Sequence, residues 1–258
     1  MHQVWPPRDD GSGTERGPDV ARDDLAADMS ERTRWTALNF VAALDGAIAI
    51  NGRSGPLGGA GDRALFQALR DRCDVVLVGA GTARAENYGP PSDRSAAARR
   101  ERGQAARPAL AIVTRTGELD DLDRLWGADD AAVVVVTGTG MPARVRADLE
   151  ARGAEVDVVG DGEAADVARA VDALHARGWG RILCEGGPTL AHDLLTAGVA
   201  SDLFTTIAGV VVGGPPTMLP ASLHAPVDLE LVTVRISGEE VMVHHRVVGP
   251  RADQPPDE

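Results

Sequence analysis

The sequence predicts an α/β fold with a mainly parallel central sheet, flanked by helices, and a C-terminal antiparallel hairpin. Two patterns predict it. Short apolar runs alternate along the chain with amphipathic segments, which is typical of buried parallel strands joined by helices. The last two apolar segments instead alternate polar and apolar residues around Ser237-Gly238, a hairpin signal. Since 43% of the 258 residues are hydrophobic, the composition supports a sizeable core.

Each element follows from local signals. Leu65, Phe66 and Leu69 fall on one face of a helix, while Pro142 suits a first helical turn and Gly153 suits a helix end. The predicted elements are, in chain order, a strand at Trp35–Ala43, a helix at Asp62–Arg72, strands at Val75–Val78, Ala109–Thr114 and Val133–Thr137, a helix at Ala143–Arg152, a strand at Val156–Val159, a helix at Glu163–Arg177, a strand at Ile182–Cys184, and hairpin strands at Leu229–Ile236 and Val241–Val247.

The two ends of the chain differ from its middle. Residues 1–34 are rich in Asp, Arg, Gly and Pro, and we expect a mostly flexible tail with a short helix near Val20–Met29. Residues 35–249 form the expected single domain, and residues 250–258 form a second flexible tail. Within the domain, the polar segment Ser92–Arg107 lacks an apolar face and is expected to be solvated surface.

Charge and composition exclude several classes of function. The net charge of −13 argues against a nucleic-acid partner, and the absence of lysine excludes both Schiff-base chemistry and a P-loop. No apolar run is long enough to span a membrane, and the start of the chain lacks a signal-peptide pattern, so we expect a cytoplasmic protein. Cys73 and Cys184 have no zinc-site spacing, and His244-His245 face opposite ways on a strand, so we expect no metal.

The segment Val76–Glu86, VLVGAGTARAE, follows a predicted strand and contains Gly79-x-Gly81. A Rossmann fingerprint needs a small third residue, but Arg84 stands there and opposes close packing of the helix on the strand. The turn nevertheless offers backbone N–H groups and the Thr82 hydroxyl to an anion.

A second candidate is Ile182–Leu195, ILCEGGPTLAHDLL. Glu185 ends a buried strand, the following glycines let a ligand approach the backbone, and Pro188 suits the first position of a helix. The free N–H groups of Thr189 and Leu190 would then attract a phosphate, and Glu185 could accept from substrate amino groups. A tight structural turn, with Glu185 bonded to backbone, explains these residues equally well.

A third candidate is Asn39–Leu57, where the first strand breaks at Asp45-Gly46. Asp45 is either a functional carboxylate or a turn former, and the turn former is favoured on physical grounds alone. Ser54 lies in a glycine-rich loop without a nucleophile elbow, which argues against a hydrolase.

Three motifs together resemble a known family. NFVAALDGAIA, GDRALFQALRDRCDVVLVGAGTARAEN and ILCEGGPTLAHDLLTAGVASDLFTTIAGVVVGG occur in order between Trp35 and Gly214. They are similar to the reductase domain of bacterial riboflavin biosynthesis, whose fold is like that of dihydrofolate reductase. The resemblance implies NADPH as cofactor, a ribosylamino-pyrimidine phosphate of the 5-amino-6-(5-phosphoribosylamino)uracil type as substrate, a ribitylamino product and a homodimer.

The resemblance also implies roles for individual residues. It points to Asp45 as the catalytic residue in the cleft, with a role in orienting the sugar or delivering a proton. The implied substrate-binding residues are Ser54, Arg70, Arg94 and Glu185, of which Ser54 and Arg70 bind the phosphate or sugar and Glu185 contacts the pyrimidine. The implied cofactor-binding residues are Thr82, Glu86, Gly187, Pro188, Thr189 and Leu190.

The sequence also departs from the family pattern. Ala47 replaces a basic residue after Asp-Gly, Glu86 stands where Asp is common, and the loop that leads to Arg94 is unusual. The distant cysteines cannot supply the zinc deaminase pattern that often precedes this reductase. Two alternatives stay open: a reductase that acts on another heterocycle such as a dihydropterin or dihydrofolate, and a non-catalytic nucleotide-binding protein. Arg84 and Arg115 are candidates for the cofactor 2′-phosphate.

Overall fold

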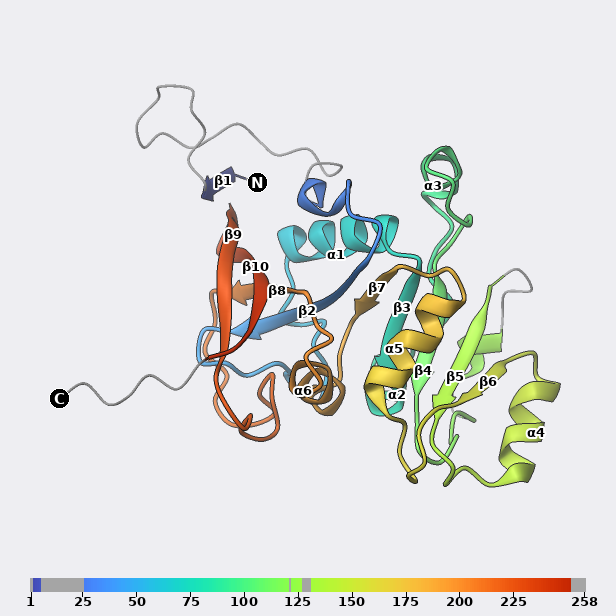
Figure 1. The fold of residues 1–258 in the computed structure, drawn as a ribbon. Helices are drawn as coiled ribbons and strands as arrows, with labels where there is room; N and C mark the ends of the chain where they lie inside the picture. Colours follow the sequence, from blue (N-terminus) through green and yellow to red (C-terminus); the bar gives the residue numbers. More distant parts are fainter. Residues whose placement is uncertain (1, 6–25, 121, 127–130, 252–258) are drawn as a thin grey trace.

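The computed structural model describes residues 2–5, 26–120, 122–126 and 131–251 (Figure 1). The strands are β1 (His2–Trp5), β2 (Trp35–Ala43), β3 (Val75–Gly79), β4 (Ala109–Val113), β5 (Val133–Thr137), β6 (Glu155–Val158), β7 (Arg181–Cys184), β8 (Asp202–Ala208), β9 (Val227–Ser237) and β10 (Glu240–Pro250). The helices are α1 (Ala60–Arg72), α2 (Ala80–Ala85), α3 (Ala96–Glu101), α4 (Ala143–Ala151), α5 (Val167–Ala176) and α6 (Pro188–Thr196), with 3-10 turns η2 (Ala27–Met29) and η3 (Asp123–Trp126).

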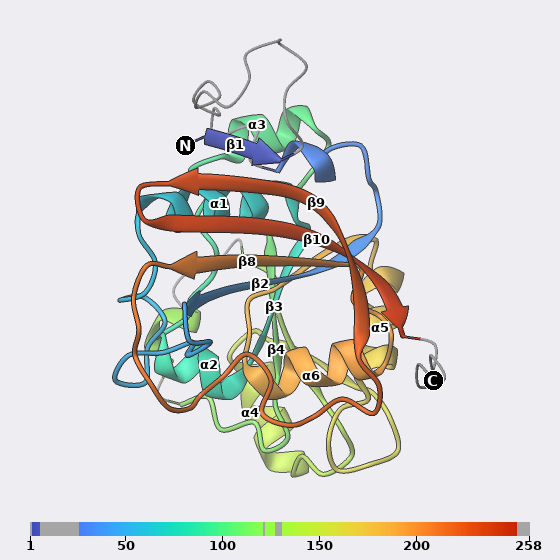
Figure 2. The ribbon, with the colours of Figure 1, turned by 90° about the vertical axis from the view of Figure 1, so that its left-hand side faces the viewer.

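The strands form one sheet in the order β1-β9-β10-β8-β2-β7-β3-β4-β5-β6. The pairs from β8-β2 through β5-β6 are parallel, whereas β10 pairs antiparallel with both β8 and β9. Figure 2 shows β9, β10, β8 and β2 side by side. The predicted parallel sheet and its C-terminal antiparallel hairpin are confirmed, and the hairpin turns at Gly238 with a φ of +56°.

Helices cover both faces of the sheet and bury its alternate residues in two cores. One core packs Val76, Val78 and Leu110 against Leu65 and Leu69 of α1. The other packs residues of the opposite strand face, among them Val75, Leu77 and Ala111, against α5 and α6. Successive residues of these strands enter different cores because side chains alternate across a strand. Both faces are buried, which explains the continuous apolar runs.

Strand β8 is an element that the strand predictions did not include. It lies between β2 and β10, parallel to one and antiparallel to the other. Asp202 opens it and is fully buried, and a buried carboxylate carries no local signal of a strand. Its burial is compensated by Arg32, whose Nη1 donates to both carboxylate oxygens at 2.7 Å, and by Ser201 Oγ at 2.7 Å.

The structure describes parts of the expected N-terminal tail, and these parts contact the domain. His2–Trp5 form β1 and pair with β9, and Met29 and Arg32 pack onto the sheet. The β1–β9 pairing and the Arg32–Asp202 bond join residues that are 170 or more positions apart in the chain, so local composition cannot reveal them. The predicted helix near Val20–Met29 appears only as η2, and residues 20–25 lie outside the described residues. Of the expected C-terminal tail, Pro250 still belongs to β10, and residues 252–258 are not described.

The segment Ser92–Arg107 is also more than solvated surface. Arg99 on α3 is 1% exposed, and its guanidinium donates to the backbone oxygens of Arg70, Asp71, Cys73 and Ala105. The first three of these carbonyls belong to the C-terminal end of α1, where a helix carries unpaired acceptors and partial negative charge. Arg99 therefore caps α1 and fixes the excursion to the domain.

Over the part of the chain that the structure describes, no helix is long and apolar enough to cross a membrane.

Candidate active site

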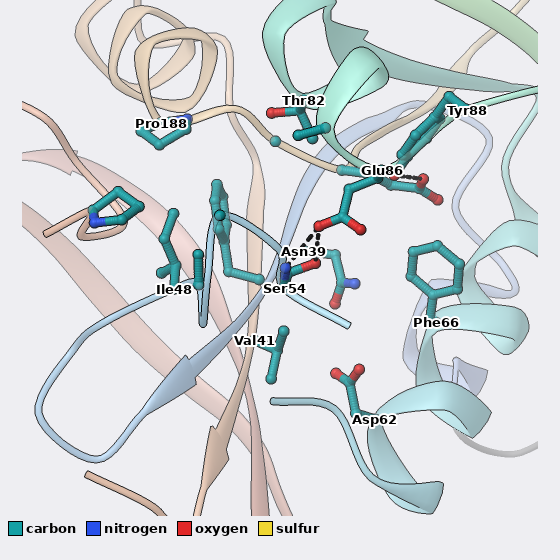
Figure 3. A pocket seen from close by; sticks show the side chains of 17 residues that line it. Asn39, Val41, Ile48, Ser54, Asp62, Phe66, Thr82, Glu86, Tyr88 and Pro188 are labelled. Carbon is teal, nitrogen blue, oxygen red and sulfur yellow. Dashed lines mark hydrogen bonds between the residues drawn. The ribbon is translucent and has the colours of Figure 1, made fainter. Parts of the chain in front are cut away.

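The candidate site lies at the carboxyl ends of the parallel strands β2, β3 and β7, where α/β sheets commonly bind ligands. A cavity of about 280 Å³ opens there (Figure 3). Its polar lining residues are Asn39, Ser54, Asp62, Thr82, Glu86, Tyr88 and Glu185. Its apolar lining includes Phe40, Val41, Ile48, Phe66, Pro188 and Pro216.

Glu185 sits at one wall of this cavity and is held by two side chains. Arg70 donates from Nε to Oε1 and from Nη2 to Oε2, both at 2.6 Å, and the Tyr88 hydroxyl donates to Oε2 at 2.8 Å. The Arg70 guanidinium also lies 4.2 Å from the centre of the Phe66 ring. A carboxylate offers about four acceptor sites, so these bonds leave roughly one, on Oε1, for a ligand.

The ion pair between Arg70 and Glu185 is largely buried. The side chain of Arg70 is 18% exposed and that of Glu185 is 1% exposed, so the ion pair is largely desolvated. Burial opposes the charged guanidinium, but Glu185 more than offsets it and the pKa of Arg70 is raised. Burial and the nearby Glu185 also raise the pKa of Tyr88. In the structure Arg70 bonds the Glu185 carboxylate, and the binding of a substrate phosphate or sugar by Arg70 remains a prediction.

Ser54 and Glu86 also meet at this cavity. The Ser54 backbone N–H and hydroxyl both donate to Glu86 Oε1, at 2.7 and 2.9 Å, and Figure 3 shows these bonds. The two residues were predicted for different ligands, Ser54 for the substrate and Glu86 for the cofactor. Their bond ties the loop after β2 to the end of α2 and closes one side of the cavity.

The β7–α6 loop approaches α2 closely. The Gly79 N–H donates to Gly186 O at 3.0 Å, and the Gly186–Gly187 peptide bond is cis. A Cβ on Gly187 would lie 2.8 Å from Thr82 Oγ1, so only glycine fits there without displacing that hydroxyl. Pro188 occupies the first position of α6, as expected.

The start of α6 separates this cavity from a second one of about 460 Å³. Thr189 and Leu190 line the second cavity together with Gly79, Arg84 and Arg115. The predicted cofactor residues are thus divided: Thr82, Glu86 and Pro188 border the first cavity, and Thr189 and Leu190 border the second. Gly187, the N-cap of α6, directly precedes Pro188 and lines neither cavity.

Asp45 does not border the first cavity. Its carboxylate accepts from the backbone N–H groups of Val212 at 3.1 Å and Gly213 at 2.5 Å, and more weakly from Ala47 at 3.5 Å. The Gly213 bond is the main reason that the pKa of Asp45 is lowered. In the structure the Asp45 carboxylate joins the end of β2 to residues 210–213, as a turn former would, and its catalytic role remains a prediction.

A third cavity of about 590 Å³ shares Ser54, Asp62, Phe66, Glu86 and Tyr88 with the first. Its cationic lining residues are Arg63, Arg70, Arg94 and Arg124. Arg94, predicted from the sequence, is exposed here. The arginines concentrate positive charge in a chain whose net charge is −13.

The sequence did not predict several residues that line the site. Asn39 and Asp62 border the first cavity, and Tyr88, the single tyrosine of the chain, holds Glu185. Asn39 lies within the motif NFVAALDGAIA, which was the available signal for it. Asp62 resembles any acidic residue in the first turn of a helix, so its sequence context carries no hint of a site. Among the described residues, no group of three or more His, Cys, Asp or Glu side chains is placed to hold a metal ion.

Comparison with known proteins places this geometry in context. A curated relative from Methanothermobacter thermautotrophicus, named 2,5-diamino-6-ribosylamino-4(3H)-pyrimidinone 5′-phosphate reductase, is 28% identical over 221 residues, which cover 83% of this chain and 99% of the relative. The chloroplastic riboflavin biosynthesis protein PYRR of Arabidopsis thaliana is 26% identical over 223 residues, which cover 85% of this chain but 34% of that protein.

Solved structures share the fold. A pyrimidine reductase-like protein from Corynebacterium diphtheriae superposes with a TM-score of 0.69 at 22% identity, covering 89% of this chain and 99% of that one. A deaminase/reductase from Thermotoga maritima gives a TM-score of 0.63 at 20% identity, covering 87% and 60%. The family described as RibD C-terminal domain matches residues 34–243. This match covers most of the chain and includes the motifs of β2, α1–α2 and the β7–α6 loop. The chain is therefore a member of the RibD C-terminal domain family.

Proposed function

We propose that the protein is an NADPH-dependent reductase that converts a ribosylamino-pyrimidine phosphate to its ribitylamino form in riboflavin biosynthesis. The observation that carries the proposal is the position of Glu185. The carboxylate is fixed by Arg70 and Tyr88, retains roughly one acceptor site, and borders a cavity that continues into an arginine-lined one. Such a carboxylate suits the N–H groups of an aminopyrimidine.

The start of α6, with the glycine loop before it, suits the pyrophosphate of a dinucleotide. We call this segment, Gly187–Leu190, the cradle. The first N–H groups of this helix have no intrahelical acceptor, and Gly187 keeps the space beside Thr82 Oγ1 open. Gly187, Thr189 and Leu190 would hold the phosphates, while Thr82, Glu86 and Pro188 border the cavity where the nicotinamide would meet the substrate. The cofactor would supply a hydride, and the protein orients the groups that receive it.

The third cavity supports a site for the substrate phosphate. Arg63, Arg94 and Arg124 line it, next to Ser54 at its junction with the first cavity. An arginine forms charge-assisted, often bidentate bonds to phosphate. Arg70 also borders this cavity, but its Nε and Nη2 are already given to Glu185. We therefore assign the phosphate to the other three arginines, and we assign Arg70 to the positioning of Glu185.

The names of two relatives differ in the pyrimidine ring of the substrate. The Methanothermobacter relative is named for a 2,5-diamino-pyrimidinone, and the Thermotoga protein for a deaminase paired with a 5-amino-uracil reductase. The first substrate carries an exocyclic amino group where the second carries an oxygen. A carboxylate acceptor such as Glu185 favours the amino form if it faces that edge of the ring.

Steady-state oxidation of NADPH tests the proposal. The purified protein should oxidise NADPH with one or both of these ribosylamino-pyrimidine phosphates, and the product should be the ribitylamino compound by mass. Turnover of dihydrofolate or a dihydropterin instead would establish the alternative reductase. Binding of NADPH without turnover of any of these substrates would establish the non-catalytic nucleotide-binding alternative.

Two further expectations accompany the proposed function, namely a homodimer and a cytoplasmic location. Light scattering of the purified protein tests the first, and fractionation of the source cells tests the second.

A further inference from the structure

Three carboxylates border the first cavity, and they differ in the side chains that pair with them. Glu185 accepts from Arg70 and Tyr88, and Glu86 accepts twice from Ser54. Asp62 is the exception: no arginine within the described residues comes within ion-pair distance of its carboxylate. Two carboxyl groups in contrasting environments are a recurrent arrangement for acid–base chemistry.

Asp62 lies in the first turn of α1 and borders both the first cavity and the third, arginine-lined cavity. Figure 3 shows its carboxylate on α1 directed into the cavity, toward Asn39 and Phe66. A Cβ on Gly58 would collide with this carboxylate, so the glycine makes room for it. The side chain can therefore touch a substrate that spans the two cavities.

The surroundings of Asp62 favour its protonated form. Burial is the main cause that raises the pKa of Asp62, and the carboxylate of Glu240 on β10 adds to it. The hydroxyl of Thr206 on β8 and the guanidinium of Arg63 on α1 act in the opposite direction, and the pKa remains raised. Glu240 itself is committed to the start of α1, where it accepts from the N–H groups of Gly59 at 2.6 Å and Gly61 at 2.8 Å.

Asn39 provides a second, independent observation. The residue is 8% exposed, and its Oδ1 is buried with no hydrogen-bond partner among the described groups. A buried acceptor without a donor costs stability, so its persistence at a cavity wall is typical of an atom that pairs with a ligand. A sugar hydroxyl beside Asp62 would supply that donor.

We propose that Asp62 is the proton donor of the reaction and that Asn39 Oδ1 accepts from the sugar hydroxyl that forms when the ring oxygen takes the proton. This inference rests on the proposed function. As the ribosyl ring opens, the C1′–O bond breaks and its electron pair goes to the oxygen, which takes the Asp62 proton. A new C1′–H bond forms with the hydride that a dihydronicotinamide supplies, so C1′ is reduced and the nicotinamide oxidised. Asp62 is left as a carboxylate and regains its proton from water through the arginine-lined cavity.

The first test is the pH dependence of kcat in the wild-type protein and in Asp62→Asn. Because the donor must be protonated, wild-type kcat should fall as pH rises through the raised pKa of Asp62. Asp62→Asn keeps the size of the side chain but has no proton to give, so kcat should drop by roughly 100- to 10,000-fold and its pH-dependent limb should vanish. Asp148→Asn, an exposed carboxylate on α4, is the matched control and should behave as wild type.

A second readout does not depend on turnover. The carbonyl stretch of a protonated carboxyl, followed by infrared difference spectroscopy between wild type and Asp62→Asn, should titrate with the same pKa as kcat. The melting temperature of Asp62→Asn should stay equal or rise at neutral pH, since the variant no longer buries a carboxyl group that can ionise. A purely structural Asp62 would instead lower the melting temperature.

The outcomes separate the two proposals. A wild-type protein that turns over neither pyrimidine overturns both the proposed function and the role of Asp62. Wild-type turnover with an unchanged kcat and pH profile in Asp62→Asn overturns the role of Asp62 alone. If Asp62→Asn does not fold, the wild-type profile decides: a kcat that stays level while the carboxyl signal titrates overturns the proposal, and a matching fall supports it.

Discussion

Arg70 and Glu185 are 115 positions apart in the chain and form a bidentate ion pair, with both N–O distances at 2.6 Å. The pair joins the face of α1 to the end of β7, two of the elements that border the candidate active site. The planar guanidinium matches the two carboxylate oxygens, and Phe66 stacks beneath it. Glu185 is thereby held in one orientation toward the cavity before any ligand arrives.

The first prediction is that Arg70 and Glu185 act as a unit in stability. Arg70→Met should lower the free energy of unfolding by about 3–5 kcal/mol, because it leaves Glu185 buried without a counter-charge. Adding Glu185→Gln should restore part of this loss, since the amide does not carry the charge. Urea unfolding of the wild type, both single variants and the double variant measures the coupling. If the losses of unfolding free energy in the two single variants add up to the loss in the double variant, the two side chains do not stabilise each other. Arg70 would then be assigned to the substrate phosphate instead.

The second prediction concerns the activity of Glu185→Gln. An amide presents a donor where the carboxylate presented only acceptors, so a charge-assisted bond to the aminopyrimidine is lost. Because such a bond contributes about 1.5–3 kcal/mol, kcat/KM should fall by roughly one to two orders of magnitude. The affinity for NADPH, measured by fluorescence titration on the same preparation, should stay unchanged. Unchanged kinetics with a large shift in melting temperature would make Glu185 a purely structural residue.

The third prediction tests the cradle at the start of α6. Gly187→Ala places a methyl group 2.8 Å from Thr82 Oγ1, so the loop or the hydroxyl must move. We expect NADPH binding to weaken by about tenfold, the equivalent of one displaced phosphate bond at about 1.4 kcal/mol. Gly162→Ala is the control, because its Cβ would meet its nearest atom only at 4.0 Å and it lies outside the three cavities. Equal NADPH affinity in both variants would place the pyrophosphate elsewhere.

The fourth prediction addresses the choice between NADPH and NADH. Arg84 and Arg115 both line the second cavity, and the Arg84 guanidinium already donates to Glu118 O at 2.8 Å. Arg115 is exposed and is the better candidate to bind the 2′-phosphate. Arg115→Ala should raise the Kd for NADPH by roughly 10- to 100-fold, the effect of a charge-assisted bond, and should leave the Kd for NADH unchanged. Arg144→Ala on α4 serves as control, and a parallel loss for both cofactors would argue against 2′-phosphate recognition.

The fifth prediction is a pH dependence of stability at His244. Its Nε2 lies 2.9 Å from Asp202 Oδ1 and its Nδ1 lies 3.6 Å from Asp28 Oδ2. Burial opposes the charged ring, but Asp202 and Asp28 outweigh it, so the pKa of His244 is raised. The stabilisation is therefore complete below about pH 6.5, the unfolded value, and is lost as pH rises through the folded pKa.

Unfolding free energies measured across this window check the prediction. The wild type should lose stability as pH rises above about 6.5, and His244→Gln should remove that slope. His245→Gln is the matched control: burial lowers the pKa of His245, so its titration lies below the window. A wild-type curve without a slope between pH 6.5 and the alkaline limit of folding would show that His244 stays neutral.

Local sequence determined most of the framework. The bounds of β2 and β5 match their predictions residue for residue, because both strands are rich in apolar residues and buried on both faces. The N-terminal proline of α6 and the glycines before it were also readable, since a helix start and a close backbone approach each need particular residue types. The family resemblance supplied Glu185 and the cofactor loop for the same reason: these features are contiguous in the chain.

Tertiary structure alone decided which side chains meet. Arg70, expected at a substrate phosphate or sugar, holds Glu185 in this structure. Arg99 was expected in solvent and instead caps α1, and Asp45 accepts from backbone that follows it by more than 160 residues. An isolated arginine or aspartate has the same local pattern whether it is solvated, paired or buried. Its fate depends on the charge and donors that the fold brings within hydrogen-bond distance. The sequence therefore determined the sheet and the cradle, and the packing of α1 against β7 and β10 determined the chemistry of Arg70, Glu185 and Asp62.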